Sequence, residues 1–165
     1  MADFRKMRRA RQEMTKEECL EILERCSEGV LSLLGDDNYP YGVPMNYFYE
    51  NGKIYFHCAK TGHKIDAIKK HDKVSFCVID KHEVLPEIYA TRFTSVIVFG
   101  RARLMDDPKE MYEVVQRLAL KFCPGDEDGV RKETDREFSA LAMIEVTIEH
   151  MTGKKAKNIL EGYGL

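Results

Sequence analysis

Hydrophobic positions recur along this chain with two spacings, one typical of helices and the other of strands. Thr15 and Glu18 have the spacing of a capping box, and the apolar residues that follow fall on one helical face, which predicts a helix over about 16–25. A short helical pattern covers about 65–71. A longer one covers 108–122, where an aspartate and a proline precede an apolar stripe. The pattern therefore predicts three helices separated by extended segments.

Six segments have the apolar or alternating composition of strands. They cover about residues 30–34, 41–49, 53–58, 74–79, 93–105 and 142–148. Asn51-Gly52 is a strong hairpin signal because both residues tolerate positive φ, and 80–90, with Pro86, is expected to be a loop. Hairpin-like connections favour a mainly β (α+β) fold, a six-stranded antiparallel barrel with flanking helices, closed or nearly closed because closure removes exposed edges. An α+β sandwich has the same number of strands and remains an alternative.

Length and charge narrow the class of protein. The 165 residues suit one domain over 15–165, preceded by an arm over 1–14. The 26 basic and 28 acidic residues nearly cancel, so no overall field attracts nucleic acid or an anionic membrane. The arm alone is basic, and it either is a solvated tail or embraces a partner subunit. Its cationic residues are Arg5, Lys6, Arg8, Arg9 and Arg11.

The five cysteines are odd in number and none forms a Cys-x-x-Cys pair, so no disulfide framework is expected. The polar N-terminus and the absence of a long apolar run favour a cytoplasmic protein without a membrane segment. No metal site is expected, because structural zinc sites need two closely spaced ligand pairs. The spacing is wrong for this in His57, Cys58, His63, His71 and Cys77.

A basic turn joins the strand 53–58 to the helix that follows it. Gly62 removes the Cβ that would keep an anion from the backbone, Lys60 and Lys64 add positive charge, and a helix start has unpaired N–H groups. This combination predicts a phosphate site, with His63 assisting. A merely solvated basic turn is the alternative.

Three segments together resemble the FMN-binding split-barrel family related to pyridoxamine 5′-phosphate oxidase, and within it the nitroimidazole-resistance-type branch. They are Tyr39–Tyr47, Ile54–Lys64 and Thr94–Ala102, and the resemblance extends over about 14–154. The resemblance implies a six-stranded split barrel that binds FMN at the interface of a homodimer.

The resemblance also implies which residues contact the cofactor. Pro44 has no N–H, so free backbone groups near it suit the polar edge of a flavin ring, although an edge strand or bulge explains Pro44 equally well. His57 is implied near an electron acceptor, whereas a hydrogen-bonded structural histidine is the alternative. The implied cofactor residues are Val43, Pro44, Met45, Asn46, Ala59, Lys60, Gly62, His63, Lys64, Thr94, Ser95 and Val96.

The leading functional prediction is an FMN-dependent oxidoreductase that reduces a small acceptor such as a nitroaromatic or a quinone-like molecule, with NADH or NADPH as a possible reductant. A non-enzymatic FMN-binding or sensing protein and a haem-binding split barrel are the alternatives. Oxidation of pyridoxamine phosphate is not expected, because the chain has no tryptophan and its tail, 161–165, lacks the Trp and Arg of that oxidase.

Overall fold

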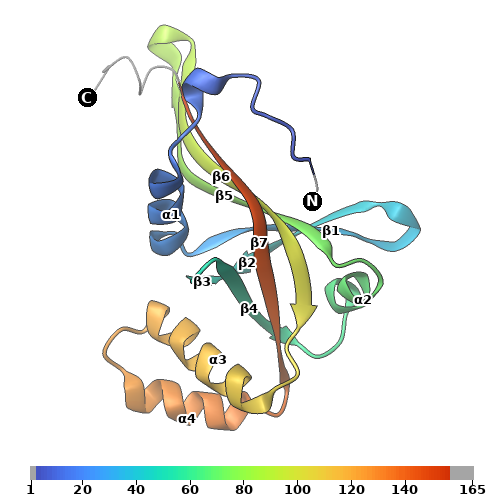
Figure 1. Cartoon of the computed structure of the whole chain (residues 1–165). Coiled ribbons are helices and arrows are strands. Elements are labelled where there is room, and N and C mark those ends of the chain that lie inside the picture. The colour runs from blue at the N-terminus through green and yellow to red at the C-terminus, as the bar shows by residue number, and fades with distance from the viewer. Residues whose placement is uncertain (1–2, 157–165) are drawn as a thin grey trace.

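The computed structural model describes residues 3–156, which form one seven-stranded sheet accompanied by four α-helices (Figure 1). The strands are β1 (Glu28–Leu34), β2 (Pro40–Asn46), β3 (Phe48–Glu50), β4 (Lys53–Ala59), β5 (Lys73–Leu85), β6 (Ala90–Leu104) and β7 (Leu141–Lys155). The helices are α1 (Lys16–Arg25), α2 (His63–Lys70), α3 (Pro108–Phe122) and α4 (Glu127–Glu137). The tail 161–165, on which the argument against pyridoxamine phosphate partly rests, lies outside the described residues.

The strand order is β2-β1-β5-β6-β7-β4-β3, and every neighbouring pair is antiparallel. The prediction of six strands was wrong because the segment expected over 41–49 is divided at Tyr47. The Tyr47 backbone N–H turns away to donate to the Ser27 carbonyl at 3.1 Å, and its ring is fully buried. β2 and β3 therefore lie at opposite edges of the sheet. The chain joins the two edges, but within residues 3–156 no ladder of hydrogen bonds closes the barrel.

The core fills the inside of this curved sheet. Inward residues such as Phe56 and Phe76 are completely buried and meet edge-to-face at 5.1 Å, while Leu23 of α1 and Ile65 of α2 join the same cluster. A second, smaller cluster lies where α3 packs on β4 and β7, and it includes Leu118. The apolar faces predicted for the first three helices are thus confirmed, together with the capping box at the start of α1.

β5 and β6 continue into a long hairpin beyond the barrel, seen at the top of Figure 1. The loop expected over 80–90 was wrong, because only 86–89 forms the turn and the flanking residues pair as strands. Most side chains here are exposed on both faces, so the sequence shows no alternation. A register shift at Asp80 marks a bulge where the hairpin leaves the barrel.

α4 has no counterpart among the predicted elements. Its buried positions are Val130 and Thr134, four residues apart, and the rest of the helix is dominated by charged residues. The sequence signal for a helical face is consequently weak. The Asp126 side chain caps the helix by accepting from the Gly129 N–H at 3.1 Å. β7 is also longer than expected and extends seven residues past 148 to Lys155.

The N-terminal arm lies against its own chain in the part that the structure describes. The Phe4 ring stacks on His150 at a centroid distance of 4.5 Å and is tilted against Phe99. The Met14 N–H donates to the Gly153 carbonyl at 2.9 Å. Residues 3–14 therefore run beside β7 before α1 begins.

Candidate functional site

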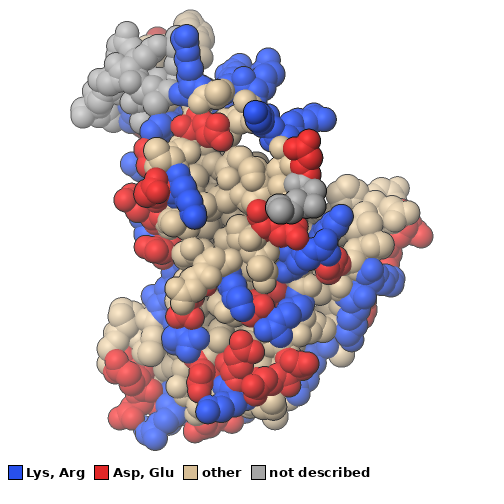
Figure 2. All heavy atoms as spheres, viewed as in Figure 1, with Lys and Arg blue, Asp and Glu red and all other residues tan. Residues whose placement is uncertain are grey.

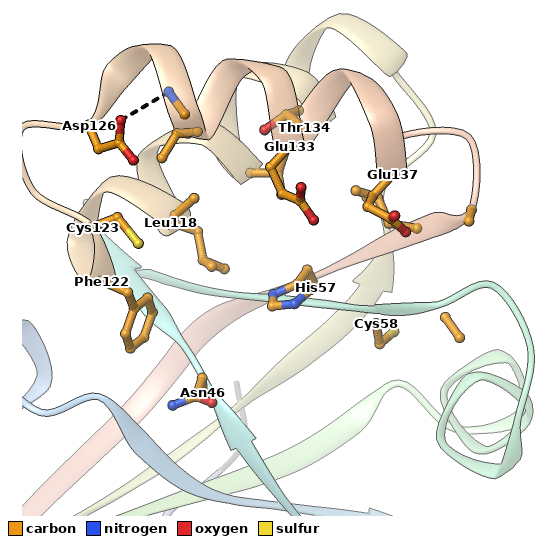
Figure 3. Close-up of a pocket in the computed structure, with 17 residues that line it drawn as sticks. Asn46, His57, Cys58, Leu118, Phe122, Cys123, Asp126, Glu133, Thr134 and Glu137 are labelled. Atoms are coloured by element: carbon orange, nitrogen blue, oxygen red, sulfur yellow. Dashed lines mark hydrogen bonds between the residues drawn. The ribbon is translucent and has the colours of Figure 1, made fainter.

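A cavity of about 910 Å³ separates β4 and the start of β7 from α3 and α4. Figure 3 shows β4 on one side of this space and α4 across it. Its wall is mainly apolar, with Leu118, Phe122, Val130 and Leu141 among the lining residues. This size and composition are typical of a small-molecule site. We call it the helix-roofed cavity.

His57 and Ala59, both predicted as site residues, line the helix-roofed cavity. On β4 the flanking Phe56 is buried in the core, so strand alternation directs His57 to the opposite side. Figure 3 shows the imidazole extending from β4 towards α4. An exposed histidine facing an apolar cavity can exchange protons with a bound molecule.

Asn46 connects this cavity with a second one of about 430 Å³, because it lines both. Pro44 and Met45 line the second cavity, which lies along β1, β2 and β5. The Asn46 amide nitrogen donates to the Ser27 carbonyl at 3.1 Å, which leaves its side-chain oxygen as an acceptor. The structure thus brings the predicted segments 43–46 and 57–59 together.

β2 is an edge strand, so one side of its backbone has no partner strand. Val43 and Met45 pack inward against the core, whereas Pro44 and Asn46 are exposed. A ligand at this edge would therefore meet Pro44 and Asn46, and in the second cavity also Met45, and the free edge offers backbone groups between them. Both explanations of Pro44, ligand-facing backbone and edge strand, are compatible with this geometry.

The start of α2 has the properties expected of an anion site. Gly62 is the N-cap with φ 127°, and a Cβ built there would meet no atom within 4 Å, so the space beside it is open. The N–H groups of His63 and Lys64 occupy the first two helical positions, which have no intrahelical acceptor. Lys60 is exposed and Lys64 is half-buried.

Lys64 links this anion site to the helix-roofed cavity. Burial raises the pKa of the Cys58 thiol, and the positive charge of Lys64 opposes that rise, so the ammonium acts on a residue of the cavity wall. The residues of the anion site begin directly after Ala59 of the cavity wall, so the anion site adjoins the β4 end of the cavity.

His63 and the 94–96 segment are engaged elsewhere. The His63 ring stacks on Tyr41 at 4.2 Å, and its Nε2 accepts from the Asp36 N–H at 3.3 Å, while its backbone N–H belongs to the first helical position of α2. Thr94 donates its hydroxyl to Asp80 at 2.5 Å, and Val96 is fully buried in the core. These side chains, with the half-buried Ser95 between them, line neither cavity.

The sequence analysis missed the residues that α3 and α4 contribute to the cavity. Phe122 and Cys123 end α3, and Glu133 and Glu137 of α4 face the cavity in Figure 3. The Asp126 cap and the spacing of Val130 and Thr134 were the available signals for α4.

Residues 15–155 match the family model described as pyridoxamine 5′-phosphate oxidase. The chain belongs to this family. A search of curated proteins found no match. Within residues 3–156 no group of three His, Cys, Asp or Glu side chains is arranged to hold a metal ion, and none of the helices there has the length and apolarity to span a membrane.

Solved structures agree with the family assignment and confirm the resemblance seen in the sequence. A candidate 5-nitroimidazole antibiotic resistance protein from Bacteroides thetaiotaomicron has a TM-score of 0.72 at 21% identity, covering 87% of this chain and 86% of the other. A conserved hypothetical protein from Mycobacterium tuberculosis has a TM-score of 0.81 at 16% identity, covering 97% and 96%. An FAD and heme binding protein from Mycobacterium smegmatis has a TM-score of 0.75 at 16% identity, covering 93% and 80%. These likenesses show the fold.

Proposed function

We propose that this protein is an FMN-dependent oxidoreductase that reduces a small electron acceptor such as a nitroaromatic, with flavin held at a homodimer interface. The observation that carries the proposal is the convergence of Asn46, His57 and Ala59 on one mainly apolar cavity that adjoins the anion site at the start of α2. FAD and heme are named for one structural neighbour, and nitroimidazole resistance for another, which supports a redox cofactor in this fold.

The residues present fit a flavin mononucleotide. The first amides of α2, the open space at Gly62 and the ammonium groups of Lys60 and Lys64 suit a phosphate. The free edge of β2 and the Asn46 side-chain oxygen suit the polar edge of an isoalloxazine ring. Bound flavin would supply the electron transfer, and the chain would orient the ring and keep water from it.

His57 would act on the acceptor within the helix-roofed cavity. Its imidazole is exposed in a mainly apolar wall and would donate a hydrogen bond or proton to a reduced nitro or carbonyl oxygen. NADH or NADPH would be the reductant in this scheme.

A second copy of the chain would cover the outer face of the sheet. Val30 and Ile97 lie in one register row across β1, β5 and β6, and they are 37% and 40% exposed, with Phe99 at 39%. The second cavity opens on the same side, since Val30 is part of its wall. Contiguous exposed apolar side chains of this kind are typical of protein interfaces.

Flavin titration of the purified chain tests the cofactor assignment. Lys64→Ala should weaken FMN binding about tenfold or more, because a charge-assisted phosphate contact is lost. Lys69→Ala, an exposed cation in the last turn of the same helix, is the matched control and should leave the affinity unchanged. A wild-type chain that releases no heat with FMN and lacks a flavin spectrum would refute the proposal.

Turnover under anaerobic conditions then separates an enzyme from a flavin carrier. His57→Ala should lower the rate of nitroaromatic reduction by about 10²-fold while flavin content stays the same. Equal rates for the variant and the wild type would remove His57 from the reaction. Absence of turnover with any reductant would favour a non-enzymatic FMN protein, and a Soret band in place of a flavin spectrum would favour the haem-binding alternative.

A further inference from the structure

The helix-roofed cavity has its charged side chains on one side only. Its wall contains three carboxylates, Asp126, Glu133 and Glu137, and no lysine or arginine. All three belong to α4 or its cap. A molecule in this cavity would therefore meet carboxylates on the α4 side, and no lysine or arginine among the described residues of the wall would offset them.

The rest of the cavity wall is mainly apolar and fits a planar ring. Leu118 and Phe122 of α3 and Leu141 of β7 face the cavity, and Figure 3 shows Phe122 close to the end of α3 beside Cys123. Water gains little from filling an apolar space, so an aromatic or aliphatic ligand is favoured there. His57 and Cys58 are the titratable side chains on the β4 side of the same space.

Arg136 partly neutralises the carboxylates of α4 from outside the cavity. It pairs with Glu133, and its Nε lies 3.1 Å from Glu137, but Arg136 itself is not part of the cavity wall. The two carboxylates remain 60% and 55% exposed, so these ion pairs are weak and the carboxylates keep acceptor capacity. One arginine is thus shared by two carboxylates, which leaves an excess of negative charge on the α4 side of the cavity.

We propose that the helix-roofed cavity takes neutral or cationic aromatic molecules and rejects anionic ones, and that Glu133 and Glu137 set this selectivity. The inference deepens the proposed function, on which it rests, by naming the charge class of the acceptor. It separates the acceptor from a phosphorylated substrate, because a phosphate on the acceptor would have to approach the two carboxylates.

Binding of a matched nitrobenzyl series to the purified full chain, loaded with FMN and without reductant, tests the inference. The probes are 4-nitrobenzyltrimethylammonium, 4-nitrobenzyl alcohol and 4-nitrophenylacetate, which share a ring and differ in charge. Calorimetry should give a dissociation constant for the cation about three- to tenfold below that of the anion, with the neutral alcohol between them. The difference should shrink in high salt.

Variants assign the selectivity to α4. In E133Q/E137Q the cation-to-anion preference should fall to about one while the affinity for the alcohol is retained. R136Q should increase the preference, because it removes the countercharge and leaves both carboxylates. E21Q/E24Q changes the net charge equally on exposed positions of α1, which contributes nothing to this cavity, and should behave as the wild type.

Two results would overturn the inference: an anion that binds wild-type protein as tightly as the cation does, or a preference unchanged in E133Q/E137Q. Failure of all three probes to bind would also overturn it. Flavin content is measured first from the absorption spectrum, so failure of the cofactor assignment is seen separately. If no flavin binds, the same titration on the flavin-free chain still tests the charge preference.

Discussion

Asp80 is a nearly buried carboxylate at the bulge of β5, and several donors surround it. Arg25 and Thr94 each approach it at 2.5 Å, and the Cys26 thiol is 3.7 Å away. Burial alone would raise the pKa of Asp80, but the hydrogen bonds from Arg25 and Thr94 and the charge of Arg25 outweigh it and hold the pKa below its usual value. This network joins the end of α1 to the base of the β5–β6 hairpin.

Thr94→Val should therefore act on stability and leave cofactor binding intact. The substitution removes a hydrogen bond to a buried charge, so the free energy of unfolding at pH 7 should fall by about 1.5–3 kcal/mol. The pKa of Asp80 is depressed in the folded protein, so its contribution is present above about pH 4 and is lost as pH falls through the folded value. Urea unfolding should accordingly show a difference between variant and wild type that shrinks below pH 4.

The same variant decides between two uses of Thr94. If its hydroxyl serves the network, FMN affinity measured by calorimetry should match that of the wild type, and Ser95→Ala, its half-buried neighbour, should change neither quantity. A tenfold loss of FMN affinity with unchanged stability would instead support the cofactor role that the sequence resemblance implies.

At the scale of elements, a side chain of α3 stabilises the chain at Tyr47, where β2 has ended and β3 has not yet begun. The Lys121 ammonium donates to the Cys26 carbonyl at 2.5 Å and to the Tyr47 carbonyl at 3.3 Å, and it lies 4.4 Å from the centre of the Tyr47 ring. Burial lowers the pKa of Lys121, which shows that the amine is held in a poorly solvated place. Through Lys121, α3, which lines the helix-roofed cavity, is held against Tyr47, the residue next to Asn46.

Lys121→Met should destabilise the protein by about 1–3 kcal/mol, because it removes the donor that these two carbonyls share. Hydrogen exchange should rise at the Tyr47 amide, whose acceptor Ser27 lies beside Cys26. Lys109→Met, at the exposed start of the same helix, should change neither unfolding nor exchange. If the Tyr47 amide exchanges as slowly in Lys121→Met as in the wild type, packing alone accounts for the division between β2 and β3.

The elements that the sequence predicts well are those whose two faces differ. α1 and α3 have clear apolar stripes and caps, and the Asn51-Gly52 turn joins β3 to β4 as expected. α4 has two buried positions and many charges, so burial against α3, a tertiary effect, decides its presence. The division at Tyr47 is equally non-local, because it depends on Ser27 and Lys121.

The residues of the candidate site likewise fall into those that local sequence predicts and those that only the tertiary structure brings together. Local sequence marks the anion site, since Gly62, Lys60 and Lys64 lie within five residues at a strand–helix junction. It cannot show that Asn46 and His57 share a cavity, because β2 and β4 are brought together only by the curvature of the sheet. The cofactor role that the resemblance implies for Thr94 stays a prediction, since the structure shows its hydroxyl donating to Asp80.

At the scale of the whole molecule, acidic and basic side chains are interspersed over the face in Figure 2, consistent with a net charge of −2. Surface charge therefore does not indicate where a partner binds, and exposed apolar side chains are the better indicator. Ile97 lies midway along β6 with its side chain turned away from the buried Val96 and Val98. It is the natural position at which to test the proposed homodimer.

Ile97→Asp should convert the dimer to a monomer, because burying an unpaired carboxylate in each half of a two-fold interface costs several kcal/mol. Sedimentation should show the dimer dissociation constant rise at least about hundredfold. FMN affinity should fall with it if each flavin needs both chains, and the wild-type affinity should then depend on protein concentration. Ile88→Asp, at the exposed hairpin tip, is the control for adding a charge to an exposed isoleucine. A wild-type chain that binds FMN as a monomer would contradict the shared site, whereas a dimer that persists in Ile97→Asp would move the interface to another face.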